Sequence, residues 1–71
     1  MKDEIIKKLT PREMAILKLI VKGIGNDEIG KEIHISIHTV KVHTSSIIRK
    51  LNAKNRTNAA YIAALNKIFD E

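Results

Sequence analysis

Apolar residues recur at intervals of three and four along most of the chain, which is the pattern of amphipathic helices rather than strands. The first clear helix start is the sequence LTPRE. Here Thr10 suits the N-cap, Pro11 the first helical position, and Glu13 completes a capping box. Gly23 follows the last apolar position and is a typical stop signal. We therefore predict a helix over about 11–22.

Two further helices are expected after a short break. The first spans about 26–33, with Asp27 and Glu28 placed favourably at its positive end. Ser36 is the next suitable N-cap, and the helix it begins runs over about 37–51. Only about two residues separate the helices, a spacing typical of a helix-turn-helix. An ordinary corner between two helices is the alternative.

A last helix is predicted over about 56–69, capped by Asn55 or Thr57. Its apolar residues cover more of the helix surface than one small core can bury. The first eight residues lack a start signal. We divide the chain into a partly helical lead-in, 1–8, and a domain, 9–71. The predicted fold is all-α with four helices.

The helix over 37–51 has two unlike faces. With Val40 at the centre of one face and 100° per residue, the apolar positions gather on that side. In the preceding helix Gly30 is small enough for close approach. The opposite face is polar and basic apart from Val42, and comprises His38, Val42, Ser45 and Arg49. Lys41 and Ser46 lie on its two flanks.

The net charge of +5 is unevenly distributed along the chain. Residues 1–32 hold seven Lys or Arg and six Asp or Glu, whereas residues 33–69 contain no carboxylate side chain. A solvated basic face is the ordinary explanation of a basic stretch. The length of this one favours a polyanionic partner instead.

A projecting helix of this kind fits the major groove of DNA, which is about 12 Å wide. Lys41 can donate to guanine, Val42 can pack on a thymine methyl, and His38 and Ser45 can reach base edges or the backbone. Contacts to phosphates are expected at the helix N-terminus and from the basic residues further along. The candidates are Thr39, Arg49, Lys50, Lys54 and Arg56.

The chain resembles the DNA-binding domain of the LuxR/FixJ/NarL family, also called GerE-like. The resemblance rests on a series of short motifs in this order: LTPRE, KG, NDEIG, HIS, TVKVH, IIRKL and NRT. The resemblance covers roughly 9–65. It implies a four-helix domain that binds inverted half-sites as a dimer, with the third helix in the major groove and the fourth at the dimer interface. It also implies base reading chiefly by the residues matching Lys41 and Val42, with those matching His38 and Ser45 contributing in some members.

Some positions depart from the pattern of the family, and together they suggest modest stability. The departures are Gly25 for Ser or Thr, Gly30 for Ala, Ser45 for a basic residue and Asn52 for Gly. On a helical wheel Ile62, Phe69 and the edge of Leu65 can serve the core. The positions left exposed in a monomer, and hence the candidate dimer surface, are Ala60, Tyr61, Ala64 and Ile68. Surface alanines that merely favour the helix are the alternative.

The predicted function is a sequence-specific regulator of transcription that binds double-stranded DNA as a homodimer, either alone or as an output domain. A protein-interaction module, or a domain like sigma-factor region four that contacts RNA polymerase, is the alternative. We expect no enzyme, metal or cofactor, because no carboxylate accompanies His34, His38 and His43. The longest apolar run has seven residues and no signal peptide begins the chain, so a cytoplasmic protein is expected.

Overall fold

A computed structural model describes residues 2–70. Within this range the chain forms helices and no strand, which confirms the all-α fold. The helices are α1 (Lys2–Lys8), α2 (Pro11–Val21), α3 (Asn26–Ile33), α4 (Ile37–Lys50) and α5 (Arg56–Leu65).

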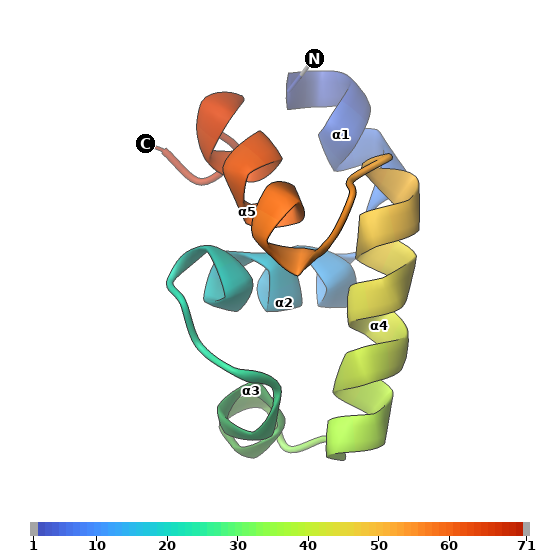
Figure 1. The fold of residues 1–71 in the computed structure, drawn as a ribbon, viewed down its shortest axis with the longest axis vertical. Coiled ribbons are helices and arrows are strands. Elements are labelled where there is room, and N and C mark those ends of the chain that lie inside the picture. Colours follow the sequence, from blue (N-terminus) through green and yellow to red (C-terminus); the bar gives the residue numbers. More distant parts are fainter. Residues whose placement is uncertain (1, 71) are drawn as a thin grey trace.

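The helices are arranged around α2, which crosses the middle of the molecule and packs on both α4 and α5 (Figure 1). The longest helix, α4, stands along one side. At one end of α4 lies α3, and at the other lie α5 and α1 (Figure 1). The core lies where these helices meet, and its most deeply buried large side chains are Ile16, Leu17, Ile29, Val40 and Ile47.

The lead-in, expected to be partly helical, forms the helix α1 over Lys2–Lys8. Ile5 is only 7% exposed and joins the core together with Leu9, one turn further along. Asp3 lies in the first turn of α1 and Lys7 in the last, which suits the helix dipole. The described residues therefore contain five helices rather than four.

The last helix is shorter than the predicted 56–69, since α5 ends at Leu65. Lys67 adopts a left-handed conformation with φ of 52°, and the amide of Ile68 donates to the carbonyl of Ala63 over 3.0 Å. This is a Schellman ending, which turns the next apolar residue back onto the helix. Ile68 is consequently 6% exposed, so its expected exposure is wrong, whereas Leu65 is 64% exposed.

The predicted helix starts are confirmed at atomic detail. Thr10 Oγ1 accepts from the amide of Glu13, and the Glu13 carboxylate accepts from the amide of Thr10, which together form the capping box. Ser36 caps α4 through the amide of Thr39, and Asn55 caps α5. These starts are encoded within four residues of sequence, which is why the pattern alone located them.

Candidate nucleic-acid interface

The turn between α3 and α4 is tight because its backbone closes on Gly30. His34 ends α3 in a left-handed conformation, and the amide of Ile35 donates to the carbonyl of Gly30 over 2.9 Å. A Cβ added at Gly30 would lie 2.7 Å from the carbonyl oxygen of Ile35, which is closer than real contacts allow. The helix-turn-helix therefore depends on a residue without a side chain at this position.

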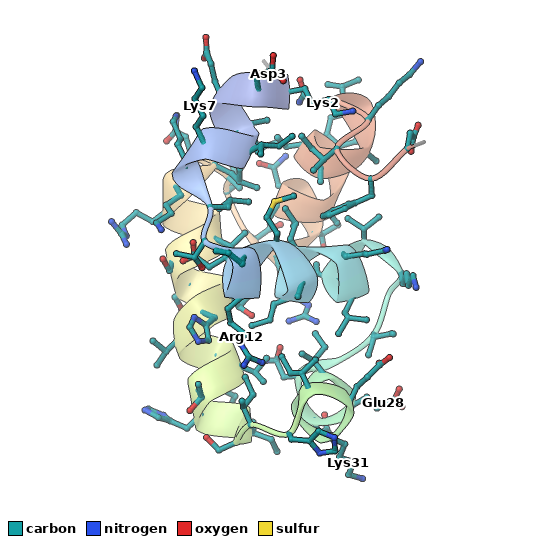
Figure 2. The ribbon with its side chains drawn as sticks, turned by 180° about the vertical axis from the view of Figure 1, so that it is seen from behind. Lys2, Asp3, Lys7, Arg12, Glu28 and Lys31 are labelled. Atoms are coloured by element: carbon teal, nitrogen blue, oxygen red, sulfur yellow. The ribbon has the colours of Figure 1, made fainter. Side chains whose placement is uncertain are left out.

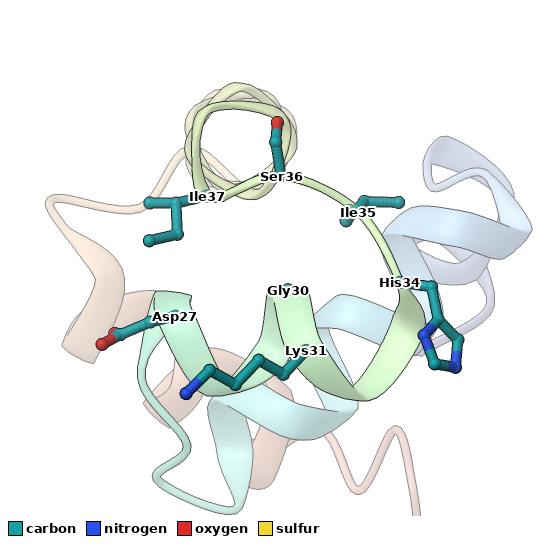
Figure 3. Close-up of a pocket in the computed structure, with 7 residues that line it drawn as sticks. All are labelled: Asp27, Gly30, Lys31, His34, Ile35, Ser36 and Ile37. Carbon is teal, nitrogen blue, oxygen red and sulfur yellow. The ribbon is translucent and has the colours of Figure 1, made fainter.

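A shallow hollow opens over this turn, between α3 and the start of α4. Figure 3 shows Gly30 at its base, with Asp27 and Lys31 along α3 and Ser36 and Ile37 on the opposite side. The hollow thus lies over the tight turn, at the position where Gly30 has no side chain.

One face of α4 is free of the rest of the domain, as the sequence pattern predicts. Val40 and Ile47 are fully buried against the core. The opposite side is exposed and carries His38, Lys41, Val42, Ser45 and Arg49. Val42 is 54% exposed, although it is apolar.

Sequence reasoning missed a second apolar residue at the same end of the helix. Ile37, the first residue of α4, is also exposed. Its position directly after the Ser36 cap could have revealed it, because side chains of a first turn that projects from the domain have few neighbours.

Two of the candidate phosphate contacts lie near the reading face, and each forms a hydrogen bond with a nearby serine. Thr39 is half-buried, and its hydroxyl forms a hydrogen bond of 2.9 Å with that of Ser36. Arg49 is exposed, with Nη2 3.4 Å from Ser46 Oγ. Lys54 is exposed in the turn before α5.

Lys50 has a strong internal partner that the sequence pattern did not indicate. Its Nζ lies 2.8 Å from Oε1 of Glu13, and Ser46 Oγ donates to Oε2 of the same carboxylate over 2.6 Å. Burial of Glu13 by itself would raise its pKa. Hydrogen bonds from Lys50, Ser46 and the Thr10 amide outweigh that effect and lower the pKa to about 2. The carboxylate is therefore ionised at neutral pH and holds α4 against α2.

Arg56 is also engaged within the domain. Its guanidinium donates to Oδ1 of Asn26, at the start of α3, and to the carbonyl oxygen of Ile24 over 2.6 Å. These bonds join the first turn of α5 to the segment between α2 and α3. The structure thus separates Lys50 and Arg56, which have intramolecular partners, from the exposed Lys41 and Lys54.

The candidate dimer surface is centred differently from the expectation. Tyr61 is 60% exposed, and Ala64 is exposed beside it. Ala60 is half-buried and Ile68 is buried. With Leu65 exposed as well, Tyr61, Ala64 and Leu65 form an apolar face of α5 at helical spacing.

Within residues 2–70 no three His, Cys, Asp or Glu side chains gather into a group that could hold a metal ion. No helix in that range is both long enough and apolar enough to span a bilayer.

Comparison with known proteins agrees with this geometry. The family model described as "Bacterial regulatory proteins, luxR family" matches residues 7–63. The response regulator protein VraR of Staphylococcus aureus (strain Mu3) is 50% identical over 60 residues, which is 84% of this chain and 29% of that protein. The proteins of the same name from Staphylococcus saprophyticus and Staphylococcus epidermidis have the same identity and coverage. The chain thus spans less than a third of the length of these relatives.

Proposed function

Since this chain belongs to the luxR family of bacterial regulatory proteins and is a DNA-binding helix-turn-helix domain, we propose that it recognises a specific double-stranded site with α4 in the major groove. The observation that carries the proposal is the exposed outward face of α4, with Val42 near its centre and Lys41 on its flank. The absence of carboxylates from residues 33–69 adds an attractive field for phosphate.

The reading residues act through different chemistry. Lys41 donates to O6 and N7 of a guanine, and exposed Val42 contacts a thymine methyl, which accounts for an apolar side chain on a hydrated face. His38 and Ser45 contact base edges or the nearby backbone. Ile37 widens the apolar contact at the N-terminal end of the helix.

The backbone contacts fall into two groups. Lys54 and Arg49 are exposed and bind phosphates directly, while the half-buried Thr39 supports a phosphate at the N-terminus of α4. Lys50 and Arg56 have partners inside the domain, so their main contribution is to hold α4 and α5 in place.

Binding to an inverted repeat requires a twofold dimer, and the apolar face of α5 is the surface that fits it. Tyr61, Ala64 and Leu65 are exposed, and the small Ala64 lets two helices approach closely. Ala60 lies at the edge of this face and is half-buried, whereas Ile68 belongs to the core. Two such domains place their recognition helices about 34 Å apart, one turn of DNA.

The relatives are named response regulators and are much longer than this chain. We therefore propose that it serves as the output domain of a transcription regulator, acting in the cytoplasm where bacterial DNA lies. Regulation of transcription then depends on where the dimer sits relative to RNA polymerase.

The test begins with selection of bound duplexes from a random library by the purified protein. Equilibrium titration of the selected duplex and of a scrambled duplex, each at low and high salt, follows. We expect the selected duplex to bind at least 10³-fold more tightly at roughly physiological salt, and both affinities to fall as salt rises. Equal affinity for the two duplexes would refute sequence-specific recognition.

A further inference from the structure

Arg12 is an exposed cation near α4 that has no hydrogen-bond or ion-pair partner among residues 2–70. It lies in the first turn of α2, next to Glu13, whose carboxylate contacts Ser46 and Lys50 of α4. Figure 2 shows Arg12 between the first turn of α2 and α3, alongside α4. Ser46 precedes Lys50 by one turn and follows Val42 by one turn, about 6 Å along the axis. Arg12 is thus the sequence neighbour of the residue that contacts the Ser46 flank of α4.

The guanidinium of Arg12 is exposed and forms no hydrogen bond or ion pair with any residue from 2 to 70. The adjacent carboxylate of Glu13 does not hold it, because that carboxylate is taken by Lys50, Ser46 and the Thr10 amide. Arg12 therefore stands beside the Glu13–Lys50 ion pair with its own charge uncompensated, and it can bind an anion from outside the domain.

The two flanks of α4 carry different cations. At 100° per residue Lys41 and Ser46 lie on opposite sides of the outward face. The Lys41 side has its own exposed ammonium group. On the Ser46 side the exposed Arg49 has Nη2 3.4 Å from Ser46 Oγ, and the charge of Lys50 is balanced by Glu13. Arg12, coming from α2, adds a second exposed cation that has no carboxylate partner among residues 2–70.

A helix in the major groove has a phosphate strand on each side, so each flank of α4 faces a strand. We propose that Arg12 binds a phosphate of the strand bordering the Ser46 side, and so fixes how deeply α4 enters the groove. The inference rests on the proposed function. It assigns to α2 a direct part in binding DNA, in addition to its place in the core.

The experiment measures the affinity of the full chain for the selected and scrambled duplexes across a range of salt concentrations. Arg12→Gln is expected to weaken both duplexes by the same factor, several-fold, and to lower the slope of log K against log salt by about 0.9. Arg12→Lys should keep the slope, because the charge remains. Lys22→Gln removes an equally exposed cation from the other end of α2 and should leave affinity and slope unchanged.

Three results would overturn the inference. They are an Arg12→Gln slope equal to that of the wild type, an equal loss in Lys22→Gln, or a change in the ratio between the two duplexes, which would mean contact with a base. Thermal melting of each variant confirms that the fold is retained, as expected for an exposed side chain. If the wild type binds neither duplex, the proposed function itself fails. If it binds normally and Arg12→Gln matches it, only the role of Arg12 fails.

Discussion

Lys50 Nζ in α4 lies 2.8 Å from Glu13 Oε1 in α2, across 37 positions of sequence. The carboxylate that completes the cap of α2 is therefore the same group that holds the C-terminal half of the recognition helix. Glu13 is 4% exposed, so this contact is poorly screened by solvent. The ionised carboxylate of Glu13 thus adds a polar tie between α2 and α4 to the apolar contacts of Val40 and Ile47.

Acid should destabilise the domain through Glu13. Its pKa in the folded state is about 2, against an ordinary value of 4.5. A lowered pKa stabilises the fold above the unfolded value, and this stabilisation is lost as the pH falls from 4.5 towards 2. At about 1.36 kcal/mol per pKa unit the loss is on the order of 3 kcal/mol. Urea unfolding of the wild type and of Glu13→Gln across this window measures it. The variant should be less stable at neutral pH and its stability should depend less on pH, whereas parallel curves would contradict the assignment.

Lys54 and Arg56 both lie near the start of α5, yet their removal should have different consequences. Lys54 is exposed, so Lys54→Ala should weaken binding to all duplexes alike and lower the salt slope by about one unit, with unchanged stability. Arg56→Ala leaves Asn26 and the Ile24 carbonyl without their partner. It should lower the free energy of unfolding by about 1–3 kcal/mol. Chemical unfolding and salt titrations of both variants separate the two effects. If Arg56→Ala keeps the stability of the wild type but lowers the slope of log K against log salt, Arg56 binds a phosphate instead.

Local signals explain which parts of the fold could be predicted from sequence. The caps at Thr10, Ser36 and Asn55 are encoded within a few residues, and the outward face of α4 follows from periodicity alone. The early end of α5 could not be found in this way. Lys67 adopts a left-handed conformation at a position usually held by Gly or Asn. As a result Ile68 is buried and Leu65 is exposed, the reverse of what a continuous helix would give.

The candidate site was predictable only in part for a related reason. A charge pattern counts every cation as free, whereas the partners of Lys50 and Arg56 lie 37 and 32 residues away in sequence. Nothing local distinguishes these two from Lys54. The full extent of helix α1 could not be predicted for the same reason. It has no capping signal, and its stability comes from burying Ile5 in the core, which is formed by residues distant in sequence.

Lys41 is the residue whose loss should change specificity most clearly. Lys41→Ala removes a donor to guanine, so it should cost about 1–3 kcal/mol on the selected duplex and relax the preference at one base pair. On scrambled DNA the loss should be limited to one charge. Titration of duplexes that differ only at that base pair provides the measurement. Equal losses on selected and scrambled DNA would make Lys41 a phosphate contact.

Ala64→Glu tests the twofold contact between α5 helices. Ala64 lies beside Tyr61 on the exposed apolar face, so near a twofold axis the variant brings two carboxylates together. The repulsion should abolish cooperative binding to a duplex with two inverted half-sites. Binding to a single half-site serves as the internal control and should survive, because α4 is untouched. Circular dichroism should show an intact fold, since the position is exposed. Leu65→Ala, which removes apolar area without adding charge, should weaken cooperativity less. Full cooperativity in Ala64→Glu would place the dimer contact on another surface of the domain.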